Sequence, residues 1–261
     1  MTVRVFTIAS GKGGTGKTTT TINLGTALAL LGKKTIVIDA DIGMANVGLL
    51  LGLERSKITL HEVLSGEASI NDAIYTGPGG LKVVPSGLSL KGFQHSNPDR
   101  LKEVMSTIID GADYVLIDAP AGISKEGIVP LAISDSVILV VNPELSSMAD
   151  ALKTKALTEM LGRSIEGVVL NRCALETVEI NSNKVAELLG CRILEVIPED
   201  ANVRRSAAFK SPIVIRSPTS PASIAYMKLA AQLAGEKFVG KQTKDQKESF
   251  VERLARSIFG G

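Results

Sequence analysis

Residues 11–18, Gly-Lys-Gly-Gly-Thr-Gly-Lys-Thr, combine glycines, lysines and a threonine at a spacing that suits phosphate chemistry. The pattern G-x-x-x-x-G-K-[ST] predicts a P-loop, whose backbone N–H groups converge on phosphate at a helix N-terminus. Lys17 is then expected to reach the β- and γ-phosphates, and the Thr18 hydroxyl to ligate Mg²⁺. The segment also contains G-x-G-x-x-G, but the Lys-Thr that follows favours a triphosphate over a dinucleotide. The predicted phosphate-binding residues are Gly11, Lys12, Gly13, Gly14, Thr15, Gly16, Lys17, Thr18 and Thr19.

Three aspartates lie at the carboxyl ends of predicted strands, where they can supply metal and water chemistry. Asp39 and Asp41 lie at the carboxyl end of the second predicted strand, the edge at which ligands bind in open α/β sheets. Asp118 ends a later strand at the Walker B position, from which a carboxylate holds Mg²⁺ through water. Each aspartate has the alternative role of capping the turn that follows it. The predicted metal-binding residues are Thr18, Asp39, Asp41 and Asp118.

The identity of the base is indicated by the residues that follow another predicted strand. A GTPase normally offers Asn-Lys-x-Asp to read guanine, whereas residues 171–174 are Asn-Arg-Cys-Ala and have no carboxylate at the last position. Adenine is therefore favoured, and the predicted cofactors are ATP or ADP with Mg²⁺.

A scaffold for these residues is indicated by apolar runs that alternate with helical patterns. The runs are continuous, as expected for strands that are buried on both faces of a parallel sheet. We therefore predict an α/β fold, with a mostly parallel twisted sheet flanked by helices on both faces. The predicted strands are 3–10, 34–40, 81–87, 113–120, 135–143, 165–172 and 191–198, and the predicted helices are 17–31, 98–110, 146–161, 181–189 and 222–235.

Length and charge limit the remaining possibilities. A chain of 261 residues can form one large α/β domain. A net charge of +2 and a pI of about 8.5 are too weakly basic to indicate nucleic-acid binding. The two cysteines, Cys173 and Cys191, form no C-x-x-C pair and indicate reduced, buried thiols. The sequence shows neither a signal-peptide pattern nor the roughly 18 to 20 consecutive apolar residues that span a bilayer, so we expect a cytoplasmic or peripheral protein.

The last residues form a separate amphipathic pattern. A helical stripe there collects the apolar residues Phe250, Val251, Leu254, Ile258 and Phe259. Such a stripe favours a helix that lies on a membrane surface, and the alternative is a helix docked on this protein or on another one. We therefore divide the chain into an ATPase domain (1–237), a charged linker (238–248) and an amphipathic membrane-targeting tail (249–261).

Six segments together resemble the MinD/ParA family of deviant-Walker P-loop ATPases, most closely its MinD branch. They fall within residues 3–235 and read KGGTGKTTTTINLG, VIDADIGMANV, IDAPAGI, VVNPELSSMADA, VLNR and VIPEDANVRRSAAFKSPI. An early lysine in the P-loop, here Lys12, is diagnostic of the family. The last residues also resemble the MinD membrane-targeting tail, including the final Phe-Gly-Gly. The resemblance implies a P-loop NTPase fold of the SIMIBI type.

The resemblance also implies roles for individual residues. Two subunits would sandwich two ATP molecules face to face, and Lys12 would reach the nucleotide of the partner. The alternative for Lys12 is a solvated lysine in a glycine loop. Asp41 would orient or activate the attacking water, with Asp39 in the same switch segment and Asn46 helping to order it. The expected catalytic residues are Lys12, Lys17 and Asp41, and the implied adenine pocket consists of Asn171, Arg172, Pro198, Glu199 and Asp200.

The functional expectation is a MinD-like ATPase with slow, Mg²⁺-dependent hydrolysis that a partner or dimerisation stimulates. ATP-dependent homodimers would bind the anionic inner face of the cell membrane reversibly through residues 249–261. They would position an effector protein within the cell and thereby help to select the division site. The sequence does not identify this effector.

Other functions share part of this pattern. A ParA-like DNA-partitioning ATPase would use surface basic residues, but Arg204, Arg205, Lys210 and Arg216 form only a modest cluster, so nucleic acid is not expected as a partner. A MinD-like regulator of flagellar number shares the ATPase core and an amphipathic tail. An iron–sulfur carrier should show a cluster-binding C-x-x-C, which is lacking. A small-molecule P-loop kinase would need neither Lys12 nor the tail.

Overall fold

The structure is a computed structural model that describes residues 3–87, 97–108, 111–122, 125–174 and 182–238. Its described residues form an eight-stranded sheet with the spatial order β3-β4-β2-β5-β1-β6-β7-β8. Neighbouring strands are parallel except for the antiparallel pair β3 and β4. The strands are β1 (Arg4–Ala9), β2 (Thr35–Asp39), β3 (Tyr75–Thr76), β4 (Lys82–Val84), β5 (Tyr114–Asp118), β6 (Ser136–Val141), β7 (Ser164–Cys173) and β8 (Ile193–Pro198).

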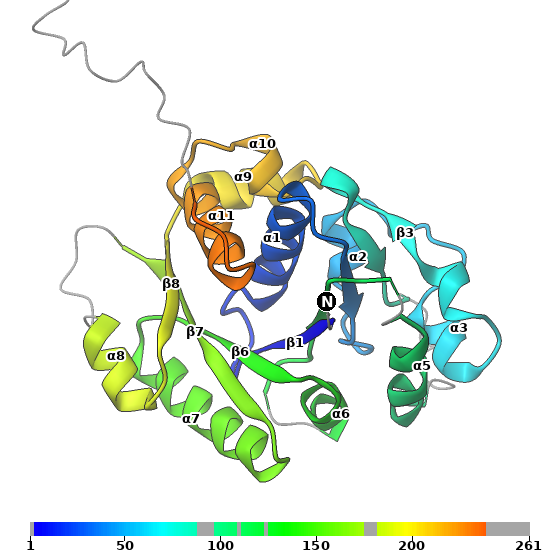
Figure 1. The fold of residues 1–261 in the computed structure, drawn as a ribbon, viewed down its shortest axis with the longest axis horizontal. Helices are drawn as coiled ribbons and strands as arrows, with labels where there is room; N and C mark the ends of the chain where they lie inside the picture. Colours follow the sequence, from blue (N-terminus) through cyan, green and yellow to red (C-terminus); the bar gives the residue numbers. More distant parts are fainter. Residues whose placement is uncertain (1–2, 88–96, 109–110, 123–124, 175–181, 239–261) are drawn as a thin grey trace, which may run out of the picture.

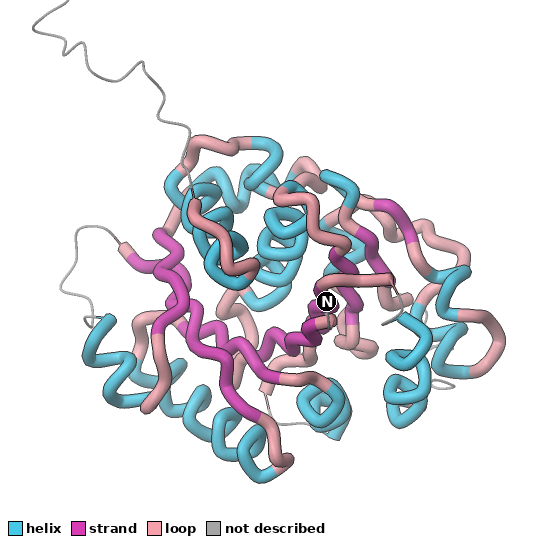
Figure 2. Tube along the Cα trace, in the orientation of Figure 1, coloured by secondary structure: helices cyan, strands magenta, loops and turns pink. Residues whose placement is uncertain are grey.

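Helices cover both faces of the sheet (Figure 1), and Figure 2 shows the strands enclosed between these two helical layers. One layer contains α1 (Lys17–Leu30), α2 (Val47–Leu50), α9 (Ala201–Ala208), α10 (Ile213–Arg216) and α11 (Pro221–Leu233). The other contains α3 (Leu60–Ser65), α5 (Leu101–Ile108), α6 (Lys125–Ile133), α7 (Leu145–Met160) and α8 (Ser182–Leu189). The predicted fold class is therefore confirmed.

The apolar core explains why the strands read as continuous apolar runs. On β1, Phe6 and Ile8 pack with α1 and α11, while Val5 and Ala9 pack on the opposite face. Successive side chains of a strand point to opposite faces, so a strand that is covered on both sides must be apolar at every position.

No helix of the described residues is long and apolar enough to cross a membrane.

Several element boundaries differ from the sequence expectation. The predicted strand 81–87 is shorter in the structure, because β4 ends at Val84. Helix α6 was not predicted: it contains Pro130, and an internal proline normally ends a helix. The short helices α3, α9 and α10 were not predicted either, because four to eight residues are too few to show a helical period. The amphipathic tail and residues 239–248 of the linker lie outside the described residues.

The strand order places the chemistry-bearing residues together. β2, β5 and β1 are neighbours, and Asp39 at the end of β2 is in register with Asp118 at the end of β5. The P-loop follows β1, which pairs with β5 on its other side. Parallel strands end at the same edge of a sheet, so three segments that are distant in sequence meet at one site.

Candidate functional site

The P-loop connects β1 to α1. Gly16 has φ of 93°, a left-handed conformation that favours glycine, and α1 begins at the next residue. A Cβ on Gly16 would lie 2.2 Å from Nδ2 of Asn171, so any other residue would displace that side chain. Asn171 also donates from Nδ2 to the carbonyl oxygen of Thr15 at 2.7 Å, which holds the loop against β7. A glycine turn followed directly by a helix N-terminus is the backbone geometry that binds phosphate.

A buried charge cluster lies at the start of α1. Lys17 Nζ is 3.3 Å from Asp118 Oδ1, and these side chains are only 7% and 0% exposed. Two threonines of α1 donate to the same carboxylate, Thr18 at 2.7 Å and Thr21 at 3.0 Å. Asp118 is thus satisfied by one cation and two hydroxyl groups. A buried charge with several partners has a defined position, as a group that handles phosphate and metal must have.

Asp39 organises the loop that carries Asp41. Its fully buried carboxylate accepts hydrogen bonds from the backbone N–H groups of Asp41 at 3.3 Å, Asn46 at 3.1 Å and Val47 at 3.0 Å. Burial, reinforced by the charge of Asp118, raises the pKa of Asp39 well above its usual value. These contacts assign the carboxylate to loop ordering, and its predicted role as a metal ligand stays a prediction.

Asp41 is partly exposed at the start of this loop and accepts a hydrogen bond from the backbone N–H of Met44 at 3.1 Å. Partial burial raises the pKa of Asp41, and the charge of Lys17 opposes the rise. The Asn46 side chain donates to the carbonyl oxygen of Met44 at 2.8 Å, so it does help to order the loop in this structure. Asp41 therefore offers a partly exposed carboxylate within range of the Lys17 charge.

Lys12 has entirely different surroundings from Lys17. Its side chain is 44% exposed and lies beside the N-terminus of α7. There Nζ is 3.1 Å from the Glu144 carboxylate and donates to the Ser146 hydroxyl at 3.3 Å. The two lysines of one loop are thus assigned to separate places, one inside the site and the other on the surface next to α7.

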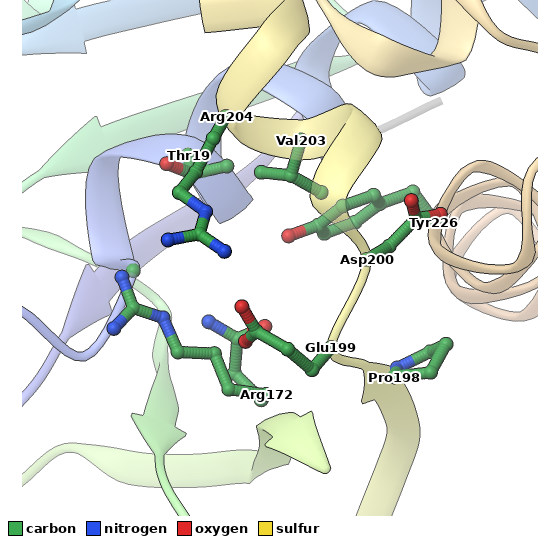
Figure 3. Close-up of a pocket in the computed structure, with 10 residues that line it drawn as sticks. Thr19, Arg172, Pro198, Glu199, Asp200, Val203, Arg204 and Tyr226 are labelled. Carbon is green, nitrogen blue, oxygen red and sulfur yellow. The ribbon is translucent and has the colours of Figure 1, made fainter. Parts of the chain in front are cut away.

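A cavity of about 200 Å³ lies beside the P-loop, between the ends of β7 and β8 and the helices α9 and α11. In Figure 3 the side chains of Arg172, Glu199 and Arg204 point into the cavity, and Tyr226 forms part of its wall. The lining residues are Gly16, Thr19, Asn171, Arg172, Pro198, Glu199, Asp200, Val203, Arg204 and Tyr226.

The cavity brings together the residues that the resemblance implied for an adenine pocket and two of the predicted phosphate-binding residues, and it adds three that were not predicted for this site. Val203, Arg204 and Tyr226 were missed, because α9 was not predicted and no local pattern marks a residue of α11 as a wall of this cavity. Arg172 adopts φ of 59°, which is uncommon for a residue other than glycine. Burial raises the pKa of Tyr226 to about 12, so its hydroxyl stays protonated at neutral pH.

The residues around the P-loop fit a nucleotide with Mg²⁺. Magnesium prefers oxygen ligands and is usually held by one or two protein groups together with phosphate oxygens and water. The Thr18 hydroxyl and the Asp118 carboxylate, 2.7 Å apart, supply such oxygens. The described residues contain no group of three or more His, Cys, Asp or Glu side chains that could hold a metal by itself. Thr15 Oγ1 is buried and has no hydrogen-bond partner within the described part of the chain, which leaves a polar atom for a ligand.

Comparison with known proteins places this geometry in context. Residues 6–213 match the family described as the CobQ/CobB/MinD/ParA nucleotide binding domain. The chain is 48% identical to an uncharacterized ATP-binding protein of Methanocaldococcus jannaschii, over 97% of this chain and 96% of that protein. It is 32% identical to the septum site-determining protein MinD of Synechocystis, over 99% of each chain.

A solved structure agrees with this similarity. The septum site-determining protein MinD of Pyrococcus horikoshii, complexed with Mg-ADP, superimposes with a TM-score of 0.85 at 35% identity. The match covers 88% of this chain and 96% of that one.

Proposed function

Because the chain belongs to the CobQ/CobB/MinD/ParA family of nucleotide-binding domains, we propose that it is a MinD-like, Mg²⁺-dependent ATPase. We further propose that its ATP-dependent homodimer binds a membrane reversibly and positions a partner protein. The observation that carries this proposal is the different placement of the two P-loop lysines. Lys17 is buried against Asp118, where it serves its own nucleotide, and Lys12 lies on the surface, where a second subunit can reach it.

ATP and ADP are the proposed nucleotides, with Mg²⁺ as the cation. Thr18 and Asp118 would hold the metal, which supplies neutralisation of the charge that develops on the transferred phosphoryl group. The cavity is the proposed adenine site. The proposed phosphate contacts come from the backbone of residues 11–16 with Lys17, Thr18 and Thr19, and the proposed base contacts from Asn171, Arg172, Pro198, Glu199 and Asp200.

Hydrolysis is proposed to depend on three side chains of this chain. Lys17 faces the β- and γ-phosphates and stabilises their charge, because a fixed cation in a buried site needs no reorganisation during the reaction. Asp41 orients the attacking water, and its raised pKa makes it a better proton acceptor than an ordinary aspartate. Asp39 keeps Asp41 in place through the backbone of the loop. Phosphoryl transfer depends mainly on such positioning.

Dimerisation is proposed to couple this site to the membrane. Lys12 would leave Glu144 and contact the nucleotide of the partner subunit, and two tails would then bind one membrane together. The tail, residues 249–261, lies outside the described residues. Its proposed target is the anionic inner face of the cell membrane, which makes the protein cytoplasmic and peripheral. The MinD relatives are named for septum site determination, and cell-division site placement is the proposed output.

The direct test uses the purified full chain. Phosphate release should require Mg²⁺, should occur with ATP rather than GTP and should be slow without an activator. Size-exclusion chromatography with light scattering should give a dimer in ATP and a monomer in ADP. A chain that stays monomeric in ATP would contradict the dimer proposal, and one that releases no phosphate from ATP under any condition would contradict the ATPase proposal.

A further inference from the structure

The segment from Ala201 to Gly235 has an unusual charge pattern. It contains three arginines and two lysines, and no aspartate or glutamate. The whole chain is close to neutral, with 29 basic and 27 acidic residues, so this excess of positive charge is local. The segment forms α9, α10 and α11 of the layer that covers α1 (Figure 1). The basic residues of the segment are Arg204, Arg205, Lys210, Arg216 and Lys228.

An exposed aromatic ring lies among these cations, where α9 turns into α10. Phe209 is 64% exposed, although the aromatic residues Phe, Tyr and Trp make up only 3% of the sequence. The Arg216 guanidinium lies over the Phe209 ring, 3.6 Å from its centroid, in a cation–π contact. We call Arg205, Phe209, Lys210, Ile215 and Arg216 the basic corner; all five are exposed, and Arg205 is one helical turn before Phe209.

The charges of the basic corner are only partly compensated. Lys210 forms an ion pair with Glu54, and the next residue along that loop, Arg55, is again basic and exposed. Neither Arg205 nor Arg216 has an ion pair with any described residue. None of these residues lines the cavity or contacts the P-loop cluster. The nucleotide site therefore leaves the basic corner unexplained.

We propose that the basic corner binds anionic phospholipid headgroups and orients the ATPase core on the membrane. This inference rests on the proposed membrane association and adds a second contact to the tail. Cationic side chains bind the negative surface of a membrane, and an aromatic ring or an isoleucine beside them can enter the interfacial region. The cationic side chains of the corner match the anionic headgroups, and its exposed Phe209 and Ile215 match the interfacial region beneath them.

The position of the corner suits this role. The described chain ends at Phe238, just after α11, which belongs to the same layer as α9 and α10 (Figure 1). The eleven linker residues 238–248 can span at most about 40 Å, so a tail on the membrane keeps this part of the core near it. Nucleic acid is the less suitable ligand, because the basic area is small and the chain as a whole is close to neutral.

The test compares two charge reversals in the full chain with ATP. Arg205→Glu with Arg216→Glu alters the corner. Arg163→Glu, just after α7, with Lys184→Glu, in α8, makes the same charge change at exposed residues on the other face. Each cation near an anionic surface strengthens binding about fivefold. Co-sedimentation with phosphatidylglycerol–phosphatidylcholine vesicles should therefore weaken at least about 25-fold for the corner variant and much less for the control. With pure phosphatidylcholine the variants should not differ.

Two further measurements keep the outcome interpretable. Both variants should bind ATP and dimerise as the wild type does, and Phe209→Ser should weaken vesicle binding without any change of charge. If the wild type itself does not sediment with anionic vesicles, the proposed membrane association fails, and the corner proposal with it. If the wild type sediments and the corner variant sediments equally well, only the corner proposal is overturned. A corner variant that keeps vesicle binding and loses retardation of a DNA duplex would make the surface a nucleic-acid site instead.

Discussion

At the scale of single residues, burial separates the functions of chemically similar side chains. Lys17 is almost fully buried against Asp118, whereas Lys12 is 44% exposed beside Glu144. The Asp39 carboxylate accepts hydrogen bonds from backbone N–H groups, whereas Asp41 is partly exposed and lies within range of the Lys17 charge. The predictions for single residues therefore differ between members of each pair.

Lys17→Ala should weaken ATP binding by at least about 100-fold, because it removes a buried cation from the phosphate site and leaves Asp118 without its ion-pair partner. Isothermal titration calorimetry measures this affinity directly. Lys34→Ala, at an exposed lysine after the other end of α1, is the matched control and should bind ATP as the wild type does. Retained affinity in the Lys17→Ala protein would contradict the P-loop assignment.

Asp41→Ala should keep ATP binding and dimerisation while slowing hydrolysis about 10²- to 10⁴-fold, the usual contribution of a general base. Phosphate release and light scattering in ATP measure the two properties on one sample. Asp72→Ala removes an exposed carboxylate far from the P-loop and should change neither. An Asp41→Ala protein with unchanged turnover, or one that stays monomeric in ATP, would show that Asp41 has another role.

Asp39→Asn should reduce the pH dependence of stability. The pKa of Asp39 is raised in the folded state by burial and by Asp118, while in the unfolded chain it is about 3.9. Between these two pKa values, Asp39 is already deprotonated in the unfolded chain but still protonated in the folded protein. The folded state therefore binds more protons, and the free energy of unfolding of the wild type falls as pH rises. The difference in free energy of unfolding, variant minus wild type, should therefore increase from about pH 4 upward and then level off. Denaturant unfolding without nucleotide measures it, and a difference that is constant with pH would contradict this account.

At the scale of elements, the P-loop contacts the N-terminus of α7 through the side chain of Lys12, and this contact is weak enough to be replaced by another. Lys12 pairs with Glu144 and donates to Ser146, and these residues are exposed. An exposed ion pair of this kind contributes only about 0 to 1 kcal/mol, so Lys12 can leave α7 at little cost. A partner subunit that offers a phosphate group would then compete for the lysine.

Lys12→Ala should bind ATP normally but fail to form the ATP-dependent dimer, and its vesicle binding should become nearly independent of ATP. Glu144→Gln is the matched control, because it removes the same ion pair and keeps the lysine. This control should dimerise in ATP as the wild type does. Size-exclusion chromatography in ATP and in ADP separates the two variants. A Lys12→Ala dimer that persists in ATP would exclude a role for Lys12 across the subunit interface.

At the scale of the whole molecule, the proposed switch depends on joining two weak anchors. Burying five apolar side chains of one tail contributes at most roughly 8 to 15 kcal/mol before the cost of ordering a short helix is subtracted. One tail should therefore bind a membrane weakly. Two tails on one ATP-bound dimer raise the effective concentration of the second, so binding becomes avid without any new contact.

Phe250→Asp with Leu254→Asp should keep ATP-dependent dimerisation and lose sedimentation with anionic vesicles, because charges on the apolar stripe oppose insertion. Both positions lie outside the described residues, so this prediction depends on the sequence pattern alone. Glu252→Asp with Arg253→Lys changes neighbouring residues without altering charge and should sediment as the wild type does. Undiminished sedimentation of the double aspartate variant would contradict the membrane tail.

The sequence by itself determined the fold class and the elements of the nucleotide site. Short, continuous apolar runs rich in β-branched residues indicate strands of a sheet that is covered on both faces, and the P-loop is a local pattern between a strand and a helix. Asp39, Asp41 and Asp118 were found because each lies at or just after the carboxyl end of a strand. These features depend on residues that are close together in the chain, and local spacing is what a sequence displays.

Only the tertiary structure decided which distant side chains meet. Asn171 holds the P-loop through Thr15 across 156 positions, and Lys12 contacts Glu144 across 132. Arg204 and Tyr226 join the cavity from α9 and α11. Such contacts depend on the order of the strands in the sheet and on how the helices pack over it, because these set the spatial neighbours of each residue. No local period in the sequence carries that information.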